Sequence, residues 1–103
     1  MKTNNVKIVC PITRVVTLLS DTWTMLIMHV FLNESTHPEK RFCELERALP
    51  GISTRTLTNK LKILETEGLL EKTESRSYKI TKRGTGLQLI EDAMRIYEKK
   101  FLK

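Results

Sequence analysis

From Phe42 to Gly68 the chain reads FCELERALPGISTRTLTNKLKILETEG, and the expected architecture follows from these residues. The first seven or eight of them predict a short amphipathic helix that ends at Pro50-Gly51, since their apolar side chains recur at i, i+3 and i+7. Ser53 is a good N-cap for a second, longer helix that Gly68 ends and whose buried stripe is Leu57, Leu61 and Leu64. Two helices joined by a tight turn predict a helix-turn-helix over about residues 42–67.

The residues after this unit predict a β-hairpin and a final helix. Residues 69–73 and 78–81 are typical of short strands, and the polar segment 74–77 is typical of the turn between them. A hairpin directly after a helix-turn-helix is the pattern of a winged helix, with the wing at about 69–81. Apolar positions at three- and four-residue spacings then predict one helix over about 83–102.

The residues before the unit predict two more helices. Pro11 suits the first turn of a helix with a broad apolar face, and a second helix is expected over roughly Trp23 to Leu32. The second helix is apolar nearly all round, so we expect it at the centre of the core. Residues 33–41 are polar, contain one proline and are predicted to be a loop. The fold class is therefore mainly α with a small β-hairpin wing (α+β), in a single domain over 1–103.

Composition limits the classes of function. No apolar run approaches the roughly 20 residues of a membrane span, and no secretory signal is visible, which predicts a soluble cytoplasmic protein that does not contact membranes. The formal net charge is +6, and residues 41–103 carry fourteen of the eighteen basic residues but only nine of the twelve acidic ones. A basic second half is the electrostatic pattern of a polyanion-binding protein.

The helix that Ser53 caps presents a face suited to a DNA groove. Arg55, Asn59 and Lys62 lie opposite its buried stripe, and no acidic residue occurs in its first two turns. Arginine can pair bidentately with guanine and asparagine with adenine, while the amides at a helix start can hold a phosphate. We expect contacts to double-stranded DNA from Ser53, Thr54, Arg55, Thr56, Thr58, Asn59 and Lys62. In the hairpin, Lys72 and Arg76 are expected to make lesser contacts to the DNA backbone.

Other site chemistries have little support. The chain has two cysteines and two histidines (Cys10, Cys43, His29 and His37), and no pair has a recognisable ligand spacing, so neither a metal nor another cofactor is expected. No nucleophile motif, glycine-rich phosphate loop or paired carboxylates are present, so an enzyme is not expected. Six aromatic residues, most at core-like positions, argue against stacking on single strands. The basic helix could instead bind an acidic protein surface, and that alternative stays open.

Several separated motifs together resemble the HxlR-type winged helix-turn-helix regulators, which are related to the MarR group. The resemblance runs from Cys10 to about Gly84. Its motifs are Cys10-Pro11, Trp23-Thr24, Arg41-Phe42-Cys43-Glu44-Leu45, Leu49-Pro50-Gly51-Ile52-Ser53, Arg55-Thr56-Leu57, Leu61-Lys62-Ile63-Leu64-Glu65, Gly68-Leu69, and Tyr78-Lys79-Ile80-Thr81 with Gly84. The chain departs from the family at Ser20-Asp21-Thr22, where Gly-Gly-Lys is common, and in a shorter wing without prolines.

The resemblance implies a homodimer whose N- and C-terminal helices form the interface and whose recognition helices enter successive major grooves. Two-fold symmetry then predicts a palindromic operator with half-site centres about one helical turn apart. The resemblance also implies transcriptional regulation, with repression the commoner mode, and a thiol sensor of oxidants or electrophiles at Cys10. A helix start and the basic residues Lys7 and Arg14 near Cys10 are features that lower a thiol pKa. A small effector bound at the dimer interface is the alternative signal.

Overall fold

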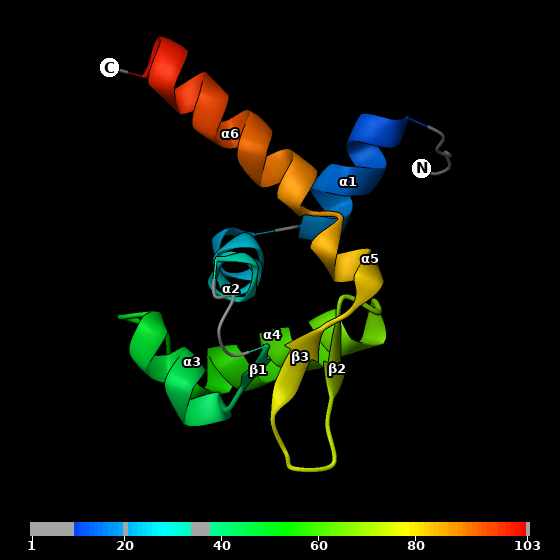
Figure 1. Cartoon of the computed structure of the whole chain (residues 1–103), viewed down its shortest axis with the longest axis vertical. Coiled ribbons are helices and arrows are strands. Elements are labelled where there is room, and N and C mark those ends of the chain that lie inside the picture. Colours follow the sequence, from blue (N-terminus) through cyan, green and yellow to red (C-terminus); the bar gives the residue numbers. More distant parts are fainter. Residues whose placement is uncertain (1–9, 20, 34–37, 103) are drawn as a thin grey trace, which may run out of the picture.

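The computed structural model describes residues 10–19, 21–33 and 38–102, which form helices and one small sheet (Figure 1). The elements in chain order are α1 (Pro11–Leu19), α2 (Thr22–Leu32), β1 (Glu39–Lys40), α3 (Phe42–Ala48), α4 (Thr54–Thr66), β2 (Leu70–Lys72), β3 (Tyr78–Ile80), α5 (Lys82–Thr85) and α6 (Gln88–Phe101). The predicted fold class is confirmed: the chain is mostly helical, with a wing beside a helix-turn-helix.

Helix α2 lies at the centre of the molecule, as its apolar sequence predicts. Asp21 is its N-cap, because one carboxylate oxygen accepts hydrogen bonds from the Thr24 amide and hydroxyl, both at 2.9 Å. The core joins α2 to α3, α4, β2 and the start of the C-terminal region through Ile27, Met28, Phe31, Leu45, Leu49, Leu57, Leu61, Leu64, Leu69, Leu70 and Leu87. Each fully buried side chain of this kind contributes about 1.5–3 kcal/mol to the free energy of folding.

The turn between α3 and α4 has the expected chemistry. Gly51 adopts φ +91°, a conformation that residues with a Cβ rarely adopt, and the Ile52 amide donates to the Leu49 carbonyl at 3.1 Å. The Ser53 hydroxyl then accepts from the Thr56 amide at 3.0 Å and caps α4. The stripe predicted for α4, at Leu57, Leu61 and Leu64, is buried. The orientation of α4 is therefore fixed by the core beneath it.

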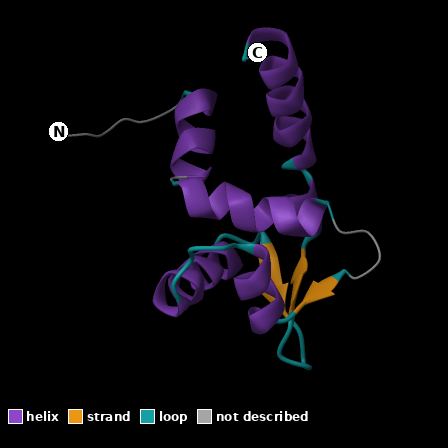
Figure 2. Cartoon of the chain, turned by 90° about the vertical axis from the view of Figure 1, so that its left-hand side faces the viewer, coloured by secondary structure: helices purple, strands orange, loops and turns teal. Residues whose placement is uncertain are grey.

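The sheet has three strands, not the two of the predicted hairpin. Its order is β1-β3-β2 with both pairings antiparallel, and Glu39 pairs with Lys79 while Leu70 pairs with Ile80. The prediction of a loop over all of 33–41 was therefore wrong at β1. Two polar residues offer no period-two apolar pattern, and β1 forms because β3 presents a free edge to it. Figure 2 shows the three strands below α2.

The single helix predicted over about 83–102 was also wrong, because the chain bends between α5 and α6. Thr81 caps α5 by accepting from the Gly84 amide at 3.0 Å, and the helix ends after Thr85. Gly84 packs against the Leu69 carbonyl and the Ile80 side chain, which leave no room for a Cβ. Helix α6 begins at Gln88 and projects away from the body of the molecule (Figures 1 and 2).

Helices α1 and α6 carry exposed apolar side chains on the side of α2 opposite the sheet. They are Ile12, Val15 and Val16 on α1, and Leu89, Met94, Ile96, Tyr97 and Phe101 on α6. Among the described residues no single helix is long and apolar enough to cross a membrane. The pair α1 and α2 satisfies length and composition only when taken together, across a bend of 84°.

Candidate nucleic-acid interface

The outward face of α4 carries three polar side chains that have no partner among the described residues. Arg55, Asn59 and Lys62 are exposed, and none has a hydrogen bond or ion pair from its side chain to any other described residue. Because the buried stripe of α4 packs in the core with α2, these side chains lie on the face of α4 that is turned away from the core. Helix α4 itself lies on the side of α2 to which the β2–β3 hairpin extends (Figure 1). Their donors and positive charges are free to bind an external ligand.

The hydroxyl groups at the start of α4 are already engaged within the chain. Ser53 caps the helix and donates to the Thr56 hydroxyl at 2.9 Å, and Thr58 donates to the Thr54 carbonyl at 2.8 Å. Thr54 donates to Glu46 of α3 at 2.7 Å, which joins the two helices of the unit. The amides of Thr54 and Arg55 have no backbone acceptor among the described residues. In the first turn, the backbone is therefore better placed than the Ser53 hydroxyl to hold a phosphate.

Lys60 differs from the neighbouring cations of α4 because it forms an ion pair with Asp21. Its side chain is only 21% exposed, and its ammonium group contacts the Asp21 carboxylate at the start of α2. The hydrogen bond from Lys60, followed by those from Thr24, holds the pKa of Asp21 below its usual value. Sequence reasoning missed this pair, since the two residues lie on different helices far apart in the chain.

The wing presents Arg76 at its tip. Arg76 is exposed and has φ 64°, and its amide donates to the Thr73 carbonyl at 3.1 Å to close the turn. Glu39 of β1 fixes the base of this turn by accepting from the Ser77 hydroxyl at 2.6 Å and the Ser75 hydroxyl at 3.3 Å. The Ser77 hydrogen bond is the main cause that lowers the pKa of Glu39, and the Ser75 bond acts in the same direction.

The other predicted wing residue, Lys72, lies with its ammonium group 5.7 Å from the centroid of the Tyr78 ring. This cation–π contact restricts the side chain but leaves it exposed to solvent. The structure thus brings both wing cations onto one hairpin, on the same side of α2 as α4 (Figures 1 and 2).

Cys10 is exposed and lies directly before α1. The Thr13 amide and the Thr13 hydroxyl, followed by the Ile12 amide, stabilise the thiolate and lower the pKa of the thiol. The lowered pKa agrees with the predicted contribution of the helix start. Arg14 does not contribute to the lowering of the pKa, and Lys7 lies outside the described residues. The Thr13 hydroxyl could have been noticed in the sequence as a donor three residues after the cysteine.

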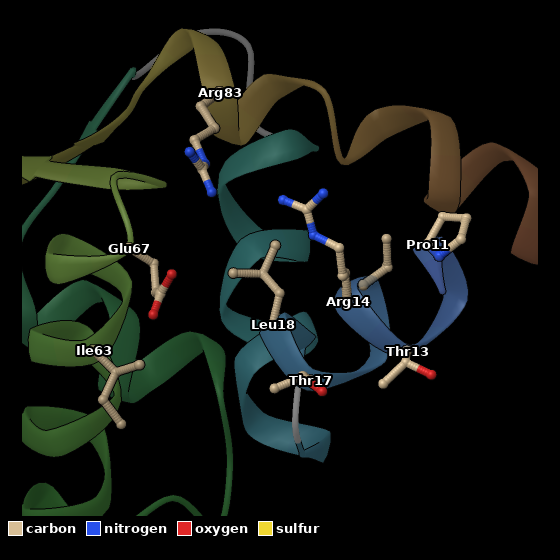
Figure 3. Close-up of a pocket in the computed structure, with 9 residues that line it drawn as sticks. Pro11, Thr13, Arg14, Thr17, Leu18, Ile63, Glu67 and Arg83 are labelled. Atoms are coloured by element: carbon tan, nitrogen blue, oxygen red, sulfur yellow. The ribbon is translucent and has the colours of Figure 1, made fainter. Parts of the chain in front are cut away.

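A hollow lies between α1, the last turns of α4, and α5 (Figure 3). Leu18 and Ile63 supply apolar surface, and the side chains of Arg14 and Arg83 extend into the space between the helices. Neither guanidinium group forms an ion pair with Glu67 or with any other residue that the structure describes. The hollow therefore combines an apolar wall with two arginine side chains and one carboxylate, that of Glu67, so its lining side chains carry more positive than negative charge.

Within the described ranges, no three His, Cys, Asp or Glu side chains are close enough to hold a metal ion. Of the residues weighed for such a site, His29 contacts Glu91, Cys43 lies 3.8 Å from an Arg47 nitrogen, and His37 lies outside the described residues.

Comparison with known proteins identifies the family. The profile of the HxlR-like helix-turn-helix family matches residues 18–103. The uncharacterized HTH-type transcriptional regulator sll1512 of Synechocystis is 37% identical over 92 residues, which cover 84% of this chain and 65% of that protein. The uncharacterized HTH-type transcriptional regulator YvaP of Bacillus subtilis is 42% identical over 64 residues, covering 61% of this chain and 56% of YvaP. The chain thus spans less than two thirds of the length of these two relatives.

Solved structures give the same result. Quinone-bound YodB from Bacillus subtilis has a TM-score of 0.79 and 32% identity, and the match covers 90% of this chain and 100% of YodB. YodB, an HTH-type transcriptional regulator, has also been solved in a reduced and in a diamide-treated form, with TM-scores of 0.75 and 0.68. These relatives are named as transcriptional regulators rather than as enzymes. The chain belongs to the family of HxlR-like helix-turn-helix proteins.

Proposed function

We propose that this protein is a cytoplasmic transcriptional regulator that binds double-stranded DNA in a sequence-specific manner, with α4 as its recognition helix. The observation that carries the proposal is that Arg55, Asn59 and Lys62 are exposed opposite the buried stripe of α4 and have no side-chain partner in the part of the chain that the structure describes. Arginine and asparagine have the donor and acceptor geometry that distinguishes guanine and adenine in the major groove. The names of its relatives support the same function.

The hydroxyls and backbone around these three residues have a positioning role in the proposed complex. The amides of Thr54 and Arg55 hold a phosphate at the start of α4, and Thr56 and Thr58 line the groove-facing side. Ser53 shapes the helix start as its cap. In the wing, Lys72 and Arg76 contact the DNA backbone on the flank of the half-site.

The acting form is a homodimer joined through α1 and α6. The exposed apolar side chains of these helices support this assembly, because a helix that is apolar on a solvent-facing side requires a partner to cover it. A two-fold dimer binds a palindromic operator with half-site centres about one helical turn apart. Repression follows if that operator overlaps a promoter.

Cys10 is the proposed sensor of oxidants or electrophiles. Its exposure and lowered pKa favour a reactive thiolate, and its place at the start of α1 connects it to the proposed dimer face. The similarity to YodB, which has been solved with a quinone and after diamide treatment, supports the same reading.

A second candidate signal is a small organic anion bound in the hollow of Figure 3. Arg14 and Arg83 would hold its negative charge, and Leu18 and Ile63 would contact its apolar part. Because the hollow touches both α1 and α4, an occupant would affect the angle between the proposed dimer face and the recognition helix. Replacing Cys10 by Ser separates the two signals, since it abolishes a thiol response and preserves a ligand response.

The primary test is selection of bound duplexes from a random pool with the reduced protein, followed by titration of the selected duplex against salt. The proposal predicts an enriched inverted repeat and a steep salt dependence. If no sequence is enriched with either reduced or oxidised protein, the alternative that α4 binds an acidic protein surface gains support.

A further inference from the structure

Glu91, near the start of α6, is buried although it is acidic. Its side chain is 5% exposed, and it is the one buried acidic residue among residues 10–19, 21–33 and 38–102. A carboxylate in such a place requires partners that replace the lost water. The residues that contact the Glu91 carboxylate therefore indicate its structural role.

The partners of Glu91 come from the end of α2 as well as from α6. One carboxylate oxygen contacts Nδ1 of His29, and the other accepts from Asn33 at 3.3 Å and from Arg95 at 3.0 Å. Arg95 also donates to the side-chain oxygen of Asn33 at 3.0 Å. We call these four residues, Glu91, His29, Asn33 and Arg95, the α2–α6 latch.

Within residues 10–19, 21–33 and 38–102, few other contacts hold α6 in its direction. Leu87 is buried and Ile90 is half-buried at the base of the helix, but every described residue from 92 to 102 is exposed. Helix α6 has 14 residues, so a tilt of about 10° at its base moves its far end by about 4 Å. The direction of the projecting helix is thus set by the few contacts around Glu91.

Helix α2, to which α6 is joined, is in turn held against α4. Helix α2 packs on α4 through the core, and the Asp21–Lys60 ion pair joins them at the surface. A fixed angle between α6 and α2 therefore also fixes the angle between α6 and the recognition helix. In a dimer joined through α6, that angle determines how far apart the two recognition helices lie.

We propose that Glu91 is a positioning residue whose latch sets the spacing between operator half-sites that the dimer accepts. This inference rests on the proposed function, because it requires a DNA-binding dimer joined through α6. Helix α6, which carries Glu91, is on the opposite side of α2 from α4 and the wing, so Glu91 acts on DNA through the geometry of the dimer (Figure 1).

The test compares Glu91→Gln with wild type on the selected operator and on versions whose half-sites are moved closer or farther by one and two base pairs. Wild type is expected to favour one spacing. The variant keeps the side-chain shape but loses the charge, and its preference for that spacing is expected to fall by about threefold or more. Glu98→Gln is the matched control, since Glu98 is exposed on the same helix and has no side-chain partner among the described residues; its spacing profile is expected to equal that of wild type.

An equal loss of affinity at every spacing would mean that Glu91 only supports folding, and a folded dimeric variant with the wild-type profile would also overturn the proposal. If Glu91→Gln does not fold, His29→Gln tests the same latch at a half-exposed position.

A second measurement does not depend on DNA. Spin labels at positions 62 and 100, in a Cys10→Ser, Cys43→Ser background diluted with unlabelled protein, report the distance between α4 and the end of α6 within one chain. Glu91→Gln is expected to broaden or shift this distance distribution, and an unchanged distribution would refute the latch. If wild type binds no duplex while the label distances respond to Glu91→Gln, the proposed DNA function fails but the positional role of the latch does not.

Discussion

Asp21 and Lys60 form an ion pair that joins the N-cap of the central helix α2 to α4, the proposed recognition helix. The same carboxylate caps α2 through Thr24, so one side chain both starts a helix and holds its neighbour.

Substitutions at Asp21 separate its two roles. Asn is as good an N-cap as Asp, so Asp21→Asn removes the ion pair alone and is expected to cost at most about 1 kcal/mol in the free energy of unfolding. Asp21→Ala also removes the cap and is expected to cost about 1 kcal/mol more. Urea denaturation measures both, and Lys60→Gln is the control, which should match Asp21→Asn. Equal stabilities for Asp21→Asn and Asp21→Ala would contradict the capping role.

Stability is expected to fall in acid because of Asp21 and Glu39, whose pKa values are lowered in the folded protein. A carboxyl with a lowered folded pKa contributes stability above its unfolded pKa, about 3.9 for Asp and 4.3 for Glu, and loses that contribution as the pH falls through the folded value. Thermal melts from pH 7 to pH 3 should therefore show the stability difference between wild type and Asp21→Asn beginning to shrink below about pH 4 and shrinking further as the pH is lowered. A difference that grew in acid would be inconsistent with the ion pair.

Sequence preference should reside in Arg55 and Asn59. Replacing either by Ala is expected to cost about 1–3 kcal/mol of discrimination at one base pair of each half-site. Competition between operators with single substitutions measures this. Lys82→Ala, on α5, is a matched control outside the α4 face and should leave the preference intact. If both α4 variants keep the wild-type preference, the placement of α4 in the groove is wrong.

Lys62 and Arg76 should contribute affinity without sequence information. Lys62→Ala and Arg76→Ala are each expected to weaken binding to all duplexes alike and to reduce the slope of log affinity against log salt by about 1. Arg76 also tests the wing separately from α4, since an unchanged slope in Arg76→Ala alone would show that the wing tip does not touch DNA.

The reactivity of Cys10 should depend on Thr13. In a Cys43→Ser background, alkylation of Cys10 is expected to reach half its maximal rate at a lower pH than in an unstructured cysteine peptide, because the amides and hydroxyl at the start of α1 stabilise the thiolate. Thr13→Val removes the hydroxyl and should move the midpoint upward. Thr17→Val, one turn farther along α1, serves as the control and should leave it unchanged.

The elements with strong local signals were predictable from the sequence. The cap at Ser53, the glycine of the turn and the leucine spacing predict α4 and its outward face without knowledge of any neighbour. The predicted residues Arg55, Asn59 and Lys62 consequently lie together on that face. Local patterns were sufficient here because each residue's role is set by others within a few positions of it.

The features that were missed depend on partners far away in the chain. Strand β1 forms only because it pairs with β3. In the sequence, Glu91 has the pattern of an ordinary solvent-exposed acidic residue, and only the folded chain brings His29 and Asn33 into contact with it. The division between α5 and α6 had a local cue in Gly84 and Gly86, but apolar spacing continued across it. The structure at these positions is determined by tertiary contacts, and the periodicity of apolar residues in the sequence carries no information about those contacts.

The strand β1 has a consequence for dissecting the protein. This strand precedes the helix-turn-helix in the chain, yet it pairs with β3 of the wing. A peptide that begins at Phe42 would therefore lose the strand that pairs with one edge of β3. It would also lose the Glu39 carboxylate, which accepts a hydrogen bond from Ser77 in the wing turn. A two-stranded hairpin is only marginally stable by itself. A peptide cut at Phe42 would also lack α2, whose Ile27, Met28 and Phe31 form the core on which α4 packs, so the smallest autonomous winged-helix unit of this chain must begin before α2 as well as before β1.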